Sequence, residues 1–304
     1  MARHLTDESQ LPCRHFQQCL SGFVALAVIF GTGCLAQNGL DNGGGGSDGS
    51  LTVLSGTATS ATTSTTSGTV SKPAQTTPIH DSDLIAYWPF DDGNEFIAAD
   101  LSGNGHDGNL LGAQPSPGVS GLGIAFTGDG SGVDIADGPD FELKDSFTIE
   151  AWFNATSLHD GHNLIFFRGD SRPGLDPYFV TIYPDRTLRF AIQNEANDVA
   201  WATAPISLGE FHHMAAVFDS QLAALNLYVD GKLRTTTFTS IKPMQRLVST
   251  EGPGIGIGHH AMRTGNDYGF IGTIDEVRLY RRALSATEVN QHFSAPHGSS
   301  PAIM

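Results

Sequence analysis

The chain has 304 residues, of which 16 are basic and 32 are acidic, so its formal charge at pH 7 is −16. Such an acidic surface repels nucleic acid and anionic lipid, because neutralising phosphate requires clustered Lys and Arg. All three cysteines, Cys13, Cys19 and Cys34, lie at the N-terminal end, so the rest of the chain has no disulfide and no thiolate metal site. This composition argues against a nucleic-acid partner and requires a domain held together by core burial.

A short apolar run near the N-terminus indicates export. Residues 20–30 (LSGFVALAVIF) carry no charge and are too few to span a bilayer, which takes roughly 20 residues, but they suit the core of a signal peptide. The small residues before Cys34 in GTGCLAQ resemble the lipobox of bacterial lipoproteins, so we predict a signal over residues 1–34 with lipidation at Cys34. The alternative is ordinary cleavage after Ala36. A lipidated chain would lie at the outer membrane or cell surface, held there only by its anchor, and a cleaved chain would be periplasmic or secreted.

The next segment, residues 35–80, is rich in Gly, Ser and Thr. Twelve of the 18 residues from 52 to 69 are Ser or Thr, and none is aromatic. Such a segment cannot bury enough apolar surface to offset its ordering entropy. We therefore predict a disordered spacer, which as a flexible coil would span on the order of 40 Å. The tail at residues 296–304 is also predicted to be disordered.

Residues 81–295 have a different texture, with short apolar runs separated by Gly, Asn and Asp. In the segment SFTIEAWF, Phe147, Ile149, Ala151 and Phe153 would share one face of a strand. Many such strands without a long helical period predict an all-β fold, an antiparallel two-sheet sandwich or jelly roll. The predicted strands are 85–90, 147–153, 164–168, 179–183, 188–193, 213–218, 225–229, 233–238 and 271–280.

Two local signals complete the predicted secondary structure. Asp230 and Gly231 separate two alternating apolar runs, which predicts a type I′ hairpin turn. Near the C-terminus, SATE is a capping box that opens a helix at Ser285. Val289 and Phe293 would lie on the packing face of this helix, together with His292.

A series of motifs then appears in a fixed order: AYWPFDDG, DLSGNGHDGNL, GIAFTGDGSGVDI, FTIEAWFNA, LGEFHHMAAVFD, LNLYVDGKL and GTIDEVRLYRRALSATEV. Over residues 83–293 this series resembles the laminin-G-like jelly-roll domain of the concanavalin A-like lectin/glucanase class. One departure is Phe211, where relatives commonly carry Trp. The resemblance implies two antiparallel sheets, one of them concave, with ligand contacts on the concave face or its rim loops.

The sequence offers no catalytic carboxylate pair. Glucanases that share this fold place their carboxylates on one strand as Glu-x-Asp-x-x-Glu or Glu-x-Asp-x-Glu, and no such string occurs here. Asp275 and Glu276 are adjacent, so on a regular strand they would point to opposite faces, with Asp275 on the face of Val277 and Leu279. We therefore predict no catalytic residue.

The resemblance also implies one bound Ca²⁺ near the junction of the first and last strands. Carried over residue by residue, the ligands would be Asp91, Asp100, Asn104 and Asp275. The alternative is that the Gly-rich turn uses its Asp and Asn side chains to bond backbone amides. Asp275 is equally consistent with a buried, hydrogen-bonded carboxylate.

A sugar-stacking site is a second ligand hypothesis. It consists of Trp201 with Asn194, Asn197 and Asp198, since sugar C–H faces pack on aromatic rings and hydroxyls need hydrogen bonds. The alternative is that Trp201 packs inside the sandwich. The adjacent histidine pairs 212–213 and 259–260 diverge on a strand and are interpreted as structural, and Arg168-Gly169-Asp170 is interpreted as a turn.

We therefore predict a non-catalytic extracytoplasmic recognition or adhesion module that binds carbohydrate or a surface glycoprotein, with calcium as a candidate cofactor. A divergent glycan hydrolase of the same fold and a purely structural cell-surface protein are the alternatives.

Overall fold

The computed structural model describes residues 81–128, 130–261 and 268–295. The predicted signal, spacer and C-terminal tail, with Cys34, lie outside these residues. The described part contains antiparallel strands, two short 3-10 helices at Pro139–Phe141 and Ser249–Glu251, and the α-helix α1 at Ala286–Ser294. In this part no helix is long and apolar enough to cross a bilayer.

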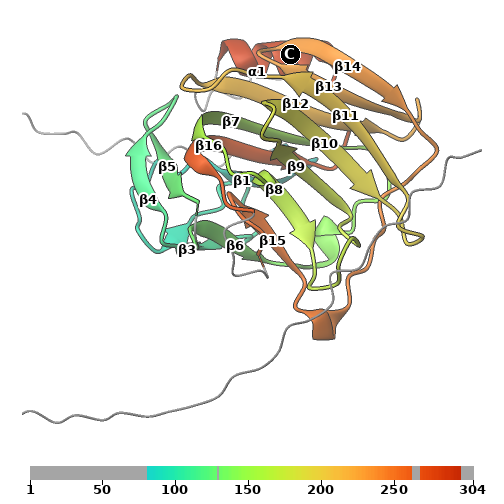
Figure 1. Ribbon diagram of the computed structural model, residues 1–304, viewed down its shortest axis with the longest axis horizontal. Helices are drawn as coiled ribbons and strands as arrows, with labels where there is room; N and C mark the ends of the chain where they lie inside the picture. Colours follow the sequence, from blue (N-terminus) through green and yellow to red (C-terminus); the bar gives the residue numbers. More distant parts are fainter. Residues whose placement is uncertain (1–80, 129, 262–267, 296–304) are drawn as a thin grey trace, which may run out of the picture. The chain divides into compact units, whose positions relative to one another are not determined.

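The strands form two sheets that pack against each other (Figure 1). Sheet A has the order β14-β13-β12-β7-β16-β5-β4, and β1 also pairs with β16. Its strands are β1 (Leu84–Trp88), β4 (Gln114–Pro117), β5 (Leu122–Thr127), β7 (Phe147–Ser157), β12 (His212–Asp219), β13 (Ala224–Val229), β14 (Lys232–Phe238) and β16 (Ile271–Tyr280).

Sheet B has the order β11-β10-β9-β8-β15-β6-β3-β2. Its strands are β2 (Ile97–Ala98), β3 (Gly108–Leu111), β6 (Gly132–Ala136), β8 (Asn163–Gly169), β9 (Tyr178–Ile182), β10 (Thr187–Gln193), β11 (Val199–Pro205) and β15 (Gly254–Ile257). The two sheets confirm the predicted all-β antiparallel sandwich.

The core lies between the inner faces of the two sheets. Phe147 is fully buried there, and its ring centroid lies 4.9 Å from that of Tyr178, 5.9 Å from Phe190 and 5.8 Å from Phe218. These four rings come from strands of both sheets, so aromatic packing joins the two layers. The predicted inner face of β7 is confirmed, since Ile149, Ala151 and Phe153 belong to the same core.

All nine predicted strands occur. The hairpin between β13 and β14 has positive φ at both Asp230 (53°) and Gly231 (69°), as a type I′ turn requires. The sequence missed the short strands β2 to β6, together with β11 and β15. These segments are short, rich in Gly or Ala, or carry Pro, and their strand structure depends on pairing with longer neighbours.

Helix α1 packs on the outer face of sheet A, as the predicted apolar face requires. Ser285 and Glu288 form the predicted capping box, in which each side chain accepts a hydrogen bond from the other residue's backbone N–H. Val289 is buried, and the ring of Phe293 stacks on Trp152 with centroids 5.6 Å apart. His292 adds a polar contact, with Nδ1 2.8 Å from Glu150 Oε2.

A bulge in β16 corrects the prediction for Asp275. Asp275 pairs with Trp152 while Arg278 pairs with Glu150, so β16 carries one extra residue, and Glu276 has a φ of 54°. An extra residue resets the alternation of a strand. Asp275 therefore lies on the outer face with Trp152, not on the inner face with Val277. The expectation that Asp275 and Glu276 point to opposite faces was also wrong, because Glu276 meets the outer-face residue Tyr87.

Buried charges lie beneath α1. Burial tends to raise the pKa of Glu150, but the contacts with His292 and with His213 outweigh it and hold the pKa below its usual range. Burial lowers the pKa of His213 to about 4, against the opposing effect of Glu150. The two side chains lie 3.6 Å apart at Nε2 and Oε1, and His213 is 1% exposed. Neutral His213 is therefore the form that the fold accommodates.

This burial predicts a loss of stability in acid. The pKa of His213 falls from 6.5 in the unfolded chain to about 4 in the fold, so its contribution is complete above pH 6.5 and is lost as the pH falls toward 4. We expect the free energy of unfolding, measured in urea, to fall between pH 7 and pH 4. The decrease should be larger in the native protein than in His213→Phe by roughly 3 kcal/mol. Equal losses in the two proteins would contradict this account.

Candidate functional site

A pocket opens on the outer face of sheet B, with a volume of about 270 Å³. This is just below the range of about 300–1,000 Å³ found for small-molecule sites. Strands β8 and β9 form its floor, and the segments around residues 162, 174, 260 and 268 form its walls. The lining residues are His162, Leu164, Phe167, Pro173, Gly174, Asp176, Phe179, His260 and Tyr268.

Strand alternation places the aromatic floor of this pocket. In β9, Tyr178 and Val180 belong to the core, so Phe179 between them faces outward. Phe167 pairs directly with Phe179 across the β8–β9 ladder and therefore shares this outer face. In β8 both Ile165 and Phe166 point to the core, and a register shift next to them turns Phe167 out.

Aromatic rings around the pocket are in contact with one another. The His162 ring lies 4.9 Å from Tyr183 and 5.8 Å from Tyr268, and the latter pair is stacked. His260 lies 3.9 Å from Phe167 and 5.6 Å from Tyr268. Burial and the nearby Arg189 charge lower the pKa of His162, which favours its neutral form. The pocket wall is thus continuous, largely aromatic and uncharged at His162.

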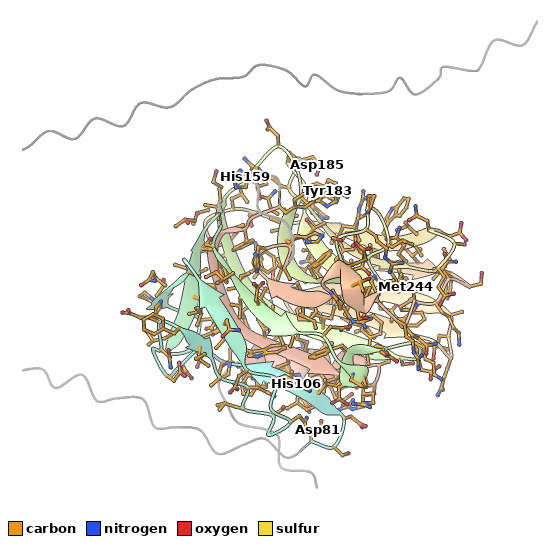
Figure 2. The ribbon with its side chains drawn as sticks, turned by 90° about the horizontal axis from the view of Figure 1, so that it is seen from below. Asp81, His106, His159, Tyr183, Asp185 and Met244 are labelled. Atoms are coloured by element: carbon orange, nitrogen blue, oxygen red, sulfur yellow. The ribbon has the colours of Figure 1, made fainter. Side chains whose placement is uncertain are left out.

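The aromatic surface continues beyond the pocket along the strands β10 and β11. The Arg189 guanidinium lies 4.1 Å from the ring centroid of Tyr183 and 5.1 Å from that of Trp201, and its Nη1 donates to Tyr183 Oη at 2.9 Å. We call His162, Tyr183, Arg189 and Trp201 the aromatic band. Figure 2 labels Tyr183, which precedes β10, and Met244, whose amide donates to Gln193 O at the other end of that strand.

Trp201 lies on the outer face and is 47% exposed, so it does not pack inside the sandwich. Of its predicted partners, Asn197 lies beside Gly174 of the pocket and accepts a hydrogen bond from Gln193. Asn194 and Asp198 instead stabilise the β10–β11 turn, because Asn194 Oδ1 accepts from the Asp198 amide and Nδ2 donates to Asp198 Oδ2 at 3.0 Å. The structure thus connects Asn197 with the pocket and uses the other two within the turn.

The four predicted calcium ligands form two separate pairs. Asp100 accepts hydrogen bonds from the Tyr87 and His106 amides, and Asn104 Nδ2 donates to Leu84 O and Ile85 O. Both side chains thus brace strand β1. In the described part of the chain, no group of three His, Cys, Asp or Glu residues is placed to hold a metal.

Asp91 and Asp275 form the second pair, at the turn between β4 and β5. Asp91 Oδ1 accepts from Leu122 N at 2.9 Å, and Asp275 Oδ2 accepts from Val119 N at 2.8 Å. Burial raises the pKa of Asp275 to about 8, although the backbone hydrogen bonds of this turn oppose the shift. Asp275 Oδ1 is buried without a hydrogen-bond partner, so this oxygen fits a cation or a proton.

The structure also shows the surroundings of the Arg-Gly-Asp tripeptide and of the pair His212-His213. Arg168 is fully buried and pairs with Asp137 at 2.7 Å, while Asp170 pairs with Arg172 at 2.7 Å. The Arg-Gly-Asp tripeptide is therefore part of the fold and is not displayed for adhesion. His212 and His213 do diverge, since His212 contacts Asp230 and His213 lies under α1.

Sequence reasoning missed most of the pocket. His162, Phe167, Phe179 and Tyr183 were placed in or beside predicted strands, and Tyr268 lay in an unassigned loop. One signal was present, since both faces of the segment LIFF are apolar, whereas a strand with one solvated face would alternate.

The match to known families follows from this fold. The family model of the concanavalin A-like lectin/glucanases superfamily, of laminin G type, matches residues 127–290, which is more than half of the chain. The chain therefore belongs to this superfamily. No curated protein matches it significantly.

Several solved structures share the fold at low identity. The botulinum neurotoxin serotype G binding domain has a TM-score of 0.56 at 13% identity, over 70% of this chain and 51% of that one. Domain 4 of AbnA, an extracellular arabinanase from Geobacillus stearothermophilus in complex with arabinotriose, has a TM-score of 0.52 at 20% identity, over 69% and 97%.

Trypanosoma rangeli sialidase has a TM-score of 0.53 at 18% identity, over 70% of this chain and 33% of the sialidase. The binding domain of Paraclostridial Mosquitocidal Protein 1 has a TM-score of 0.54 at 16% identity, over 71% of this chain and 52% of that one. This chain thus spans about half of the mosquitocidal domain and a third of the sialidase. At these identities the likeness establishes the fold alone.

The position of Trp201 can be checked by fluorescence quenching. Trp88 is 0% exposed and Trp152 7%, against 47% for Trp201, and these are the three tryptophans of the chain. Acrylamide should therefore quench mainly Trp201, and Trp201→Phe should remove most of the quenchable emission. Unchanged quenching in that variant would place Trp201 inside the sandwich instead.

Proposed function

We propose that this domain is a non-catalytic carbohydrate-binding module, whose ligand lies in the pocket and along the aromatic band of sheet B. The observation that carries the proposal is the continuous outward-facing aromatic surface around a pocket. Apolar faces of sugar rings pack on such surfaces, while hydroxyl groups require a few fixed polar partners. Phe179 and Tyr183 are half-buried and Trp201 is exposed, so their faces are available to a ligand.

Polar groups that could orient a sugar are held rigidly at one wall of the pocket. Gln193, which is 4% exposed, accepts from the Asp176 amide at 3.1 Å and donates to Gly174 O and Asn197 Oδ1. This network fixes the loop before β9 against the β10–β11 turn. A pocket wall that is already ordered in the free protein loses less conformational entropy when the ligand binds.

Three of the solved structures support a binding role, while Trypanosoma rangeli sialidase shares the same fold. One of them is a domain in complex with arabinotriose, and two are named as binding domains. Glycoside hydrolysis generally uses two carboxylates that flank the bond, whereas Asp176 is the single carboxylate among the described lining residues. The proposal is therefore recognition of a glycan or of a glycoprotein that carries it.

The proposed location rests on the N-terminal sequence. A lipid anchor at Cys34 and the spacer at residues 35–80 would hold this domain outside the cell membrane, at a distance from it. Mass spectrometry of the exported protein would reveal an N-terminal lipidated Cys34, whereas a chain that begins at Gln37 would show simple cleavage.

The glycan proposal is tested by affinity electrophoresis of the purified protein on a panel of polysaccharides. Tyr183→Ala and Trp201→Ala should each weaken retention on the preferred polymer roughly tenfold, or about 1.4 kcal/mol. The matched control is Phe238→Ala, because Phe238 is 77% exposed on β14 of sheet A, away from the pocket. Absence of binding to every polymer, or an equal loss in the control, would overturn the proposal.

We propose that Asp91 and Asp275 bind a structural Ca²⁺ ion, and that carbonyl oxygens of the turn at residues 118–122 are its remaining ligands. The orphan Asp275 Oδ1 supports this assignment. Thermal unfolding in Ca²⁺ and in EDTA should show a higher midpoint with Ca²⁺, and Asp275→Asn should abolish the difference. Identical midpoints for the native protein in the two buffers would contradict calcium binding at this turn.

A further inference from the structure

We propose that the preferred ligand is a carboxylated polysaccharide, and that Arg189 binds its carboxylate. This inference rests on the proposed glycan site and names the chemical class of its ligand. The supporting features are the absence of a carboxylate partner for Arg189 among the described residues, its position between two rings, and the nitrogen atoms that it has left to donate.

Arg189 differs from the other partly or fully buried arginines of the described residues in having no carboxylate partner among those residues. The remaining arginines that are at least partly buried in the described residues each pair with one: Arg168 with Asp137, Arg172 with Asp170, Arg278 with Glu276 and Arg282 with Glu288. Arg189 is half-buried, and none of the described carboxylates lies within 4.0 Å of it. In a chain of charge −16, this gap in pairing is a property of the site, since a partly buried charge is normally paired.

The surroundings of Arg189 hold the guanidinium in place without neutralising it. Tyr183 and Trp201 lie 4.1 and 5.1 Å away and provide cation–π contacts. Its neighbour across the β9–β10 ladder is Thr181, which is fully buried, and across the β10–β11 ladder it is Thr203. Neither of these carries a charge. The cation is therefore positioned before any ligand arrives.

The free N–H groups of the Arg189 guanidinium determine which ligand group fits there. Nε is buried and makes no hydrogen bond, while Nη1 gives one hydrogen to Tyr183 Oη. Three N–H groups on Nη1 and Nη2 remain, and a planar guanidinium edge suits the two oxygens of a carboxylate. A uronic or sialic acid residue carries such a group beside a sugar ring that can pack on Trp201.

The acidity of the chain opposes binding of a polyanion only at long range. Its overall charge repels a polyanion at long range, and salt screens that repulsion within about 10 Å at 0.1 M. Contact at a half-buried guanidinium is screened less. The site should therefore retain a preference for carboxylated polymers at moderate salt, where non-specific charge effects fade.

The test compares polymers that differ in the carboxylate. Polygalacturonate and its methyl ester share one backbone, and polysialic acid supplies a different carboxylated sugar. At 0.15 M NaCl we expect the native protein to bind polygalacturonate or polysialic acid at least tenfold more tightly than the methyl ester or neutral arabinan. In Arg189→Gln the ratio of these affinities should fall toward one, and Arg189→Lys should retain part of it.

Arg234→Gln is the charge-matched control, since Arg234 is exposed on β14 of sheet A, and it should keep the native ratio. Binding of arabinan or the methyl ester as tightly as the acidic polymers would overturn the carboxylate assignment while leaving the glycan site intact. Equal weakening of acidic and neutral polymers in Arg189→Gln would also overturn it, because Arg189 would then only support the two rings. Failure to bind any of the polymers would instead count against the glycan site itself.

Discussion

The packing of the two sheets against each other determines where this domain can bind anything. Phe147 and the rings around it occupy the space between the layers, so one face of each strand is used for stability. The outer faces and the connecting loops remain for recognition. On sheet A, helix α1 covers part of the outer face through Trp152 and Phe293. On sheet B the outer face carries the pocket and the aromatic band, where we propose that the ligand binds.

The same division explains how far the sequence could be interpreted. Regular alternation revealed the long strands, the inner face of β7 and the hairpin at Asp230, because each depends on neighbours in the chain. The position of Asp275 was wrong, since one extra residue in β16 reverses the alternation and leaves no sign in composition. The pocket combines segments as distant as His162 and Tyr268, which the pairing of β8 with β15 and a backbone hydrogen bond from Leu164 to Tyr268 bring into contact. Of the predicted ligand residues, Trp201 and Asn197 border this surface. The other residues of the pocket and the aromatic band were identified only from the structure.

The polar residues of the fold have two distinct roles. Asp100 and Asn104 form hydrogen bonds with the backbone of strand β1. Arg168 and Asp170 form salt bridges within sheet B and its loops. Polar side chains that are already paired within the fold stabilise it and are not available to contact a ligand. Arg189 has a different role, because the rings of Tyr183 and Trp201 hold it and no carboxylate of the described residues pairs with it. A motif such as Arg-Gly-Asp shows why residue identity alone cannot separate these roles.

The pairing of β1 with β16 has a geometric consequence for display. The described chain enters through β1, and α1 follows β16, so both ends of the domain belong to sheet A, whereas the pocket opens on the far side of sheet B. Asp81, where the described chain begins, therefore precedes a strand of the layer opposite the pocket. A polymer bound as proposed above would lie across the layer that carries neither end of the described domain.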